Sequence, residues 1–424
     1  MVKNFKAIKF YTKNIFWVFL EKTLRIIFGF TVGFWVARHL GPSNFGSLNY
    51  AISIYSILAV FITLGLDGVI IQKLNESEAD SRKILGSTLF LKFSFSIITF
   101  LCFNFLSYYL IRDNNLRFIT IVVSSSILLN SLNISDLFFQ SRTNRKLSTI
   151  PYIISLLITN LFKIILLINE SELIYFAYII VLESIIATTT GLYLLNKEEK
   201  IIQFIISKEK IKEFLKNGSV LIFASLATIF YLKIDQIMIE YFLDTYAVGI
   251  YSAAVRINEF MYFIPVAITS TFFPALLDYE KKDKQKFIRR LKNLMSLIVY
   301  VGFFISLILF FFSDIIIQFF YGIDFKKSSI ILKIISFGNI FIFIDLVGGK
   351  WYLAKKYYKD IAIKNVSAAI INIILNIFLI QKYGVIGAAV STLFSYFYLG
   401  IFYDLLQKKT SILFKIKLKS TYSF

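Results

Sequence analysis

Cysteine and histidine are nearly absent from this chain of 424 residues, which contains one of each, Cys102 and His39. A single cysteine excludes an intrachain disulfide, and within an apolar segment we expect Cys102 to be a small buried side chain. A lone histidine with no cysteine nearby argues against a metal site, because such sites gather several ligands. We therefore expect no bound metal, and we expect His39 to lie at a membrane interface.

Long polar stretches are also missing, so no segment between the apolar ones is large enough for a folded soluble domain. Hydrophobic residues make up 57% of the chain, against roughly 45–50% in soluble domains, and the mean hydropathy is +0.72. A helix needs about 20 apolar residues to cross a bilayer, and the chain offers about a dozen such segments. The composition therefore predicts an all-α polytopic membrane protein.

Acidic residues are scarce, with 26 Asp and Glu against 46 Lys and Arg and a formal net charge of +20. Such a surplus is typical of nucleic-acid-binding proteins, but here the basic residues gather in short loops between apolar segments, as the positive-inside rule describes. We therefore expect no nucleic-acid partner, and the bias toward alternate loops predicts two cytoplasmic termini. No cleavage pattern follows the first apolar run, which predicts a retained helix rather than a signal peptide.

The apolar segments form two sets of six. They lie at about 14–38, 47–72, 84–111, 115–140, 148–168, 172–195, 217–242, 247–277, 293–313, 328–354, 361–381 and 384–406. This predicts an N-terminal lobe at 1–200, a Lys-rich cytoplasmic linker at 201–216 and a C-terminal lobe at 217–424. Residues 40–54 align with 243–257, which pairs Gly46 with Gly249 at the first turn of each half. Because six spans preserve orientation, this indicates a parallel internal repeat.

The predicted span 115–140 carries the clearest polar pattern. Its polar residues follow one another at spacings of four, three, three and four, and they are Ser126, Asn130, Asn133, Asp136 and Gln140. Such spacing places side chains on one face of a helix. A polar stripe inside a membrane must meet water or another helix. It therefore either lines an aqueous cavity or forms interhelical hydrogen bonds.

Several predicted spans also contain cations, which are costly in lipid unless they face a wet cavity or an anion. Arg25 and Arg256 lie deepest, and arginine offers a charged planar fork for phosphate oxygens. We expect these two to line a cavity, with a structural ion pair as the alternative, since Glu21 and Arg25 are spaced i,i+4. The lysines assigned to the same cationic cavity are Lys233, Lys163, Lys333 and Lys92, although Lys92 could instead snorkel to the interface.

Acids within the spans are fewer than the cations, which favours an anionic substrate such as a phosphate or pyrophosphate. They are Asp136, Glu183, Asp235, Glu259 and Asp345. On the helix 247–277, Ser252, Arg256 and Glu259 share one face. The acids, above all Asp235, Glu259 and Asp345, are either counter-ions or proton or sodium sites for coupled transport. We expect no other cofactor.

Three segments together carry a family resemblance. Residues 37–54 (ARHLGPSNFGSLNYAISI) and 235–276 resemble corresponding parts of the two halves of polysaccharide and O-antigen flippases. Residues 371–396 are similar to the eleventh-to-twelfth helix segment of that family, although Gln381 stands where many relatives have proline. These flippases belong to the multidrug/oligosaccharidyl-lipid/polysaccharide exporter superfamily.

The resemblance implies two six-helix lobes around a central cavity that alternates between the membrane faces. It implies flipping of an undecaprenyl-pyrophosphate-linked oligosaccharide, for O-antigen or capsule, across a bacterial cytoplasmic membrane. It also implies cavity roles for Arg25 and, inside the matched motif, Arg256. The partners to expect are the lipid-linked oligosaccharide, membrane lipids, and a glycan polymerase with its chain-length regulator.

Two other functions stay open. A multidrug extruder of the same fold would export mostly cationic drugs and should favour an acidic cavity, against the surplus of Lys and Arg. A membrane glycan polymerase or ligase would need a substantial external loop with catalytic groups, but the longest predicted external loops, about 313–327 and 111–117, are short and hold no histidine. We therefore expect a transporter and not an enzyme.

Overall fold

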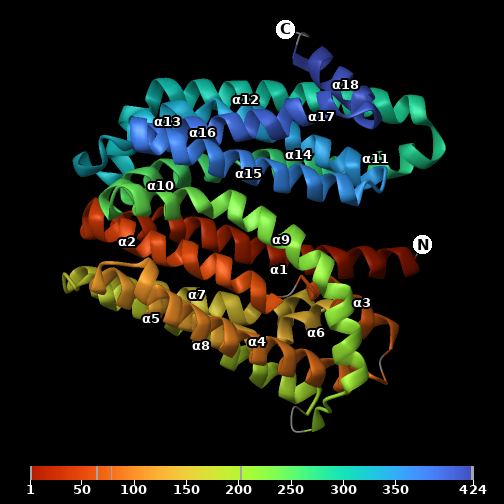
Figure 1. Cartoon of the computed structure of the whole chain (residues 1–424). Coiled ribbons are helices and arrows are strands. Elements are labelled where there is room, and N and C mark those ends of the chain that lie inside the picture. The colour runs from red at the N-terminus through yellow and green to blue at the C-terminus, as the bar shows by residue number, and fades with distance from the viewer. Residues whose placement is uncertain (1, 64, 78, 201–202, 422–424) are drawn as a thin grey trace. The chain divides into compact units, whose positions relative to one another are not determined.

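The computed structural model describes residues 2–63, 65–77, 79–200 and 203–421, and all regular secondary structure among them is helical (Figure 1). The α-helices are α1 (Val2–Phe30), α2 (Val32–Thr63), α3 (Asp67–Glu76), α4 (Ser81–Leu110), α5 (Asn114–Ser131), α6 (Ser135–Ser141), α7 (Arg145–Ile168), α8 (Leu173–Glu198), α9 (Lys208–Phe242), α10 (Thr245–Phe260), α11 (Phe263–Lys282), α12 (Lys284–Tyr321), α13 (Ser328–Ser336), α14 (Gly338–Ala354), α15 (Tyr358–Tyr383), α16 (Val385–Phe397), α17 (Tyr403–Leu406) and α18 (Ser411–Thr421). A π-helical turn, η3 (Tyr398–Phe402), joins α16 to α17, and short 3₁₀ turns lie at Ile323–Phe325 and Lys408–Thr410. The predicted all-α membrane fold is confirmed.

Eight helical stretches among the described residues are long and apolar enough to cross a membrane, or ten if each of two bent pairs counts as one span. The first stretch, Asn14–Glu76, is 63 residues long and contains two of the predicted spans. The bent pairs are α5 with α6 and α13 with α14, each bent by 44°. Eleven of the twelve predicted spans fall in these stretches, and the twelfth, 217–242, falls in α9.

The chain divides into two compact units. The first consists of Met1–Leu40 and Tyr50–Leu226, and the second of Gly41–Asn49 and Ala227–Phe424. In the first unit α7 packs on α1 and α8, while α5 packs on α4 and α8. In the second unit α12 packs on α11, α13, α14 and α18, and α15 packs on α16.

The turn predicted after the first span begins at Gly41, whose backbone lies in the left-handed region at φ 68° inside α2. Glycine adopts this conformation without steric cost. The segment that follows packs against the N-terminal part of α10 within the second unit. A Cβ on Gly46 would lie 1.7 Å from the Thr245 carbonyl oxygen, and a Cβ on Gly249 would lie 2.0 Å from that of Pro42. The two glycines that the internal alignment pairs are therefore both needed for this backbone contact.

Two expectations about exposure and boundaries are corrected. Cys102 is exposed, not buried, because it lies on the outer face of α4 beside the exposed Leu101. The last part of the predicted linker 201–216 is not a separate segment, because α9 runs without a break from Lys208 to Phe242. Residues 201 and 202 of that linker lie outside the described residues.

Candidate functional site

Arg25 is the cation that we predicted for the cavity side of the first unit. Its Nε lies 2.9 Å from Glu21 Oε1, and its terminal nitrogen lies 3.4 Å from Glu183 Oε1 of α8. The i,i+4 pair is therefore formed, and a second carboxylate joins it. Two carboxylates and one guanidinium give the cluster a net negative formal charge. The charge of Arg25 is therefore already compensated in this conformation and is not free to bind a further anion.

Lys92 does not snorkel to the interface. Its side chain is 8% exposed, and its Nζ donates a 2.6 Å hydrogen bond to Asp67 at the start of α3. The snorkelling prediction is wrong because a carboxylate 25 residues away in the chain compensates the charge inside the unit. Lys163 lies partly buried in α7 and also has an interaction partner.

The polar stripe does not lie on one continuous helix. The backbone breaks between α5 and α6 at residues 132–134, with a bend of 44°. The prediction of a single face is wrong because spacing alone assumes unbroken helical geometry, and nothing in that pattern shows a bend.

The stripe residues instead bond to neighbouring helices. Asn130 donates to the Tyr55 hydroxyl of α2 at 2.8 Å, and Asn133 donates to the Tyr152 hydroxyl of α7 at 3.0 Å. The carboxylate of Asp136 accepts from Ser148 of α7 and, at 2.9 Å, from Gln140. Asn130, Asn133 and Asp136 therefore form hydrogen bonds to neighbouring helices, of the kind that holds membrane helices together, whereas Gln140 bonds to Asp136 within α6.

An ion pair outside the twelve predicted spans joins α3 to α9. Lys73 Nζ lies 3.0 Å from Glu213 Oε1. The hydrogen bond from Lys73 holds the pKa of the Glu213 carboxyl below its ordinary value. This pair ties the start of α9 to the first unit.

Arg256 is the cation predicted for the second unit, and it differs from Arg25. It lies exposed on α10 and has no ion pair or hydrogen bond with any described residue. The carboxylate of Glu259 instead lies 3.9 Å from Lys233 Nζ of α9. Ser252, expected on the same face as Arg256, is only 3% exposed.

Two other lysines within the spans of the second unit are each paired with an acid. Lys333 of α13 donates to Asp314 of α12 at 2.6 Å. Asp345 of α14 accepts from Lys364 of α15, which is 3% exposed. Asp345 is therefore a counter-ion here, and Lys364, which sequence patterns did not single out, is its partner.

Asp235 is a buried acid of the second unit that forms no ion pair with any described residue. It lies on α9 with 5% exposure, and it accepts hydrogen bonds from Tyr251 at 2.5 Å, Asn376 at 2.6 Å and Thr392 at 2.7 Å. Asn376 also donates to Asn372 Oδ1 at 3.0 Å, while its own Oδ1 lacks a partner. Two hydroxyl groups and one amide N–H therefore converge on one buried carboxylate. The carboxylate and hydroxyl oxygens gathered there are of the class that hard cations prefer.

Sequence reasoning found Asp235 but missed the groups around it. Asn372 and Asn376 are spaced i,i+4 on α15 and are both fully buried. Two asparagines at that spacing in an apolar span indicate a buried polar site, and this pattern could have been found in the sequence. Tyr251 and Thr392 gave none, because single hydroxyls are common in membrane helices. Among the described residues no three His, Cys, Asp or Glu side chains gather at one point.

The amino-acid sequence matches the profile of a family described as "Polysaccharide biosynthesis protein" over residues 11–280, and a second profile, MatE, over residues 221–378. The "Capsular polysaccharide biosynthesis protein CapF" of Staphylococcus aureus is 24% identical over 401 residues, which is 94% of this chain and 99% of that protein. The "Probable low-salt glycan biosynthesis flippase Agl15" of Haloferax volcanii is 30% identical over 177 residues. That match spans 41% of this chain and 37% of the relative.

Two solved structures share the fold. An inward-facing multidrug resistance transporter of the MATE family has a TM-score of 0.73 at 12% identity, with 94% of this chain and 96% of that chain covered. The lipid II flippase MurJ in an inward closed conformation has a TM-score of 0.69 at 18% identity, with 97% and 91% covered. These structures establish the helical architecture. Because the family profile covers more than half of the sequence, the chain belongs to the polysaccharide biosynthesis protein family, within the multidrug/oligosaccharidyl-lipid/polysaccharide exporter superfamily.

Proposed function

We propose that this multi-pass membrane protein is a flippase for a lipid-linked glycan. Its substrate would be an undecaprenyl-pyrophosphate-linked oligosaccharide, moved from the cytoplasmic to the outer leaflet of a bacterial inner membrane by alternating access through a cationic cavity. The family match and the names of the two relatives support a transporter of glycan precursors rather than an enzyme. A glycan polymerase and a chain-length regulator would act on the product.

The observation that carries this proposal is the state of Arg256. It is a permanently charged, exposed guanidinium on a membrane helix and has no anion among the described residues. Leaving such a charge uncompensated within a span is costly. A pyrophosphate would compensate it, and the planar fork of arginine fits phosphate oxygens in a bidentate manner.

Complementation of a flippase-null bacterial strain tests the proposal, with surface glycan as the readout and membrane levels checked by immunoblot. We expect wild type to restore surface glycan and Arg256→Lys to give an intermediate level. Arg256→Ala should lose at least about 90% of the glycan, because loss of a charge-assisted hydrogen bond weakens binding more than about tenfold. Arg112→Ala is the matched control, since Arg112 is also an exposed arginine without an ion pair but lies between helices. Full glycan with well-expressed Arg256→Ala would refute the role of Arg256.

We further propose that the Asp235 cluster is the coupling site and that its ion is sodium. A carboxylate buried without a cation is unfavourable unless it is protonated or binds one. The unpartnered Asn376 Oδ1 supports sodium, since rotation of that amide would direct a further oxygen toward the ion.

Thermal unfolding of the purified protein in sodium against choline chloride tests the ion site. A ligand at 100 times its dissociation constant stabilises the folded state by about 2.7 kcal/mol. We expect sodium to raise the unfolding midpoint of wild type and of Asp278→Asn, an exposed carboxylate on α11, but not of Asp235→Asn. Equal sodium effects on all three would show that Asp235 does not bind the ion.

A multidrug extruder is the second candidate, and two observations favour it. The MatE profile matches residues 221–378, and the MATE structure has the higher TM-score of the two described above. The ion pairs of Lys92, Lys233 and Lys333 also weaken the case built on a cationic interior. Drug efflux in a susceptible host separates the candidates, because an extruder would confer resistance whereas a glycan flippase would not.

A further inference from the structure

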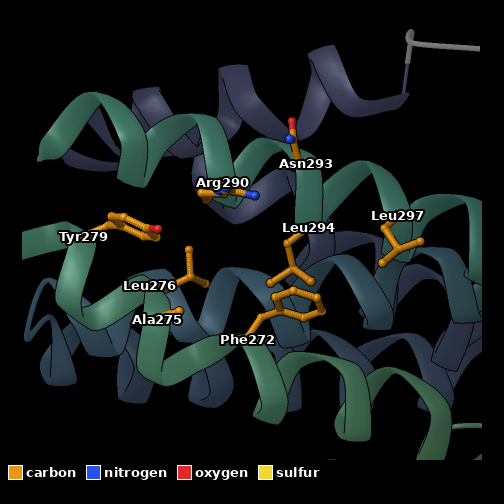
Figure 2. Close-up of a pocket in the computed structure, with 8 residues that line it drawn as sticks. All are labelled: Phe272, Ala275, Leu276, Tyr279, Arg290, Asn293, Leu294 and Leu297. Atoms are coloured by element: carbon orange, nitrogen blue, oxygen red, sulfur yellow. The ribbon is translucent and has the colours of Figure 1, made fainter.

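A groove runs between the antiparallel helices α11 and α12 of the second unit (Figure 2). Its volume is about 250 Å³. Each helix contributes residues at spacings i, i+3, i+4 and i+7, which form one face of a helix. They are Phe272, Ala275, Leu276 and Tyr279 from α11 and Arg290, Asn293, Leu294 and Leu297 from α12.

One end of the groove is polar and the other is apolar. Arg290 and Tyr279 lie toward the turn that joins the helices at Asp283, whereas Leu294, Phe272 and Leu297 lie farther along (Figure 2). Asn293 lies level with Leu294, and its amide points away from α11 (Figure 2). From Arg290 to Leu297 the helix rises about 10 Å, at 1.5 Å per residue. The groove therefore has the polarity of one lipid molecule: a charged head and an apolar tail.

Arg290 has no anionic partner in the chain. It forms no ion pair or hydrogen bond with any described residue, and the same is true of Asn293. Two acids near the turn are already engaged, since Glu280 lies 2.8 Å from Lys355 Nζ and Asp283 caps the first turn of α12. The third, Asp278, is exposed on α11 and forms no ion pair with Arg290.

The surroundings add positive charge. Seven basic residues lie within this short segment: Lys281, Lys282, Lys284, Lys286, Arg289, Arg290 and Lys292. Basic clusters at membrane helix ends attract anionic lipids of the adjacent leaflet. Arginine binds phosphate oxygens with two parallel hydrogen bonds.

We propose that this groove binds an anionic phospholipid of the membrane, with its phosphate against Arg290 and part of one acyl chain between α11 and α12. An oligosaccharide does not fit, because apolar side chains line the far part of the groove. The site is separate from Arg256 and the Asp235 cluster and does not rest on the flippase proposal. It requires only that the helices lie in a bilayer.

Native mass spectrometry of the delipidated full-length protein tests the site, with phosphatidylglycerol and phosphatidylcholine titrated separately. We expect one phosphatidylglycerol to bind most tightly, and Arg290→Ala to weaken it at least about tenfold. The matched control is Arg289→Ala, which removes the same charge from the adjacent residue outside the groove. Equal weakening by both variants would show diffuse attraction to the basic segment and would overturn the proposal.

Variants that fill the groove with a larger side chain test whether an acyl chain enters it. Ala275→Trp should weaken phosphatidylglycerol binding about as much as Arg290→Ala, whereas Ala267→Trp, an exposed position of α11 outside the groove, should not. A monodisperse gel-filtration peak establishes folding, and Leu297→Trp is the second filling variant if Ala275→Trp fails. Unchanged binding in a folded filling variant would overturn chain insertion.

Competition with two other ligands distinguishes a phospholipid from other possible occupants of the groove. Displacement of phosphatidylglycerol by inorganic phosphate would overturn the proposal in favour of a free-phosphate site. Tighter binding of undecaprenyl phosphate than of phosphatidylglycerol would overturn it in favour of a polyprenyl lipid. Retention of phosphatidylglycerol against both would support it.

Discussion

Lys417 offers the sharpest test of how the C-terminal helix α18 is held on the second unit. It is fully buried, and its Nζ donates to the Gly400 carbonyl at 2.7 Å and to the Asp404 carboxylate. Asp404 is also fully buried and accepts from the Tyr352 hydroxyl. Gly400 lies in the π-helical turn, where the altered backbone pattern frees a carbonyl for a side-chain donor. We therefore predict that Lys417→Met strongly destabilises the second unit.

The magnitude follows from what the substitution leaves behind. Methionine fills a similar volume, but Asp404 would keep only Tyr352 as a side-chain partner among the described residues. Removing one partner of a buried ion pair costs about 3–5 kcal/mol. Lys415→Met is the matched control, because Lys415 is exposed on the same helix, and surface substitutions usually stay within about 0.5 kcal/mol.

Urea unfolding followed by tryptophan fluorescence measures the difference, since Trp351 is 3% exposed and adjoins Tyr352 in the chain. A thiol-reactive dye is unsuitable, because Cys102 is exposed in the folded protein. The double variant Lys417→Met/Asp404→Leu should recover much of the loss, as buried pairs replaced by apolar residues are often neutral. Equal stability of Lys417→Met and Lys415→Met would refute the reasoning.

The pair also predicts a pH dependence. Burial, and next the charge of Lys364, lower the pKa of Lys417 to about 8, below the value of about 10.4 for an unfolded chain. Between these values the unfolded chain binds more protons than the folded one. The free energy of unfolding of wild type should therefore rise with pH, relative to Lys417→Met, from about pH 8 to about 10.4.

Two further predictions concern the packing and the polar surface. Gly249→Ala should destabilise the second unit by about 1–3 kcal/mol in the same urea assay, because its Cβ would lie 2.0 Å from the Pro42 carbonyl oxygen. Gly349→Ala is the control and should not destabilise it, because no atom lies within 4 Å of a Cβ at that position. The hydrogen bond from Lys73 lowers the pKa of Glu213 from an ordinary 4.5, so its stabilising effect is present above that pH and is lost below it. Wild type and Glu213→Gln should therefore differ in unfolding midpoint at pH 7 and converge at the acidic end.

Much of the fold could be predicted because lipid restricts the choices. Apolar length located the spans, and the internal alignment paired Gly46 with Gly249, which approach the backbone of the facing segment too closely for any Cβ. The bend between α5 and α6 was not predictable in the same way. The stripe from Asn130 to Gln140 has helical spacing throughout, and only tertiary packing shows that the backbone turns within it.

The site was harder to predict because charges find partners through the fold and not through the sequence. Asp67 compensates Lys92 from 25 residues away, and Lys364 compensates Asp345 from 19 residues away. Each pair joins two different helices, so no pattern along one helix reveals it. The sequence therefore overstated the free positive charge of the interior, whereas the structure reduces the predicted cations of the second unit to one without an anion, Arg256.

The two unbalanced groups of the second unit lie on helices that are directly bonded. Asp235 on α9 accepts from the hydroxyl of Tyr251, which precedes Arg256 by five residues on α10. A cation bound at Asp235 would compete with Tyr251 for the carboxylate oxygen, and it would thereby alter the contact that holds α10 on α9. If this change alters the affinity of Arg256 for an anion, the anion alters the affinity for the cation by the same factor, because coupling between two sites is reciprocal. One hydrogen bond between α9 and α10 thus provides a physical route by which an ion gradient could drive movement of an anionic head group.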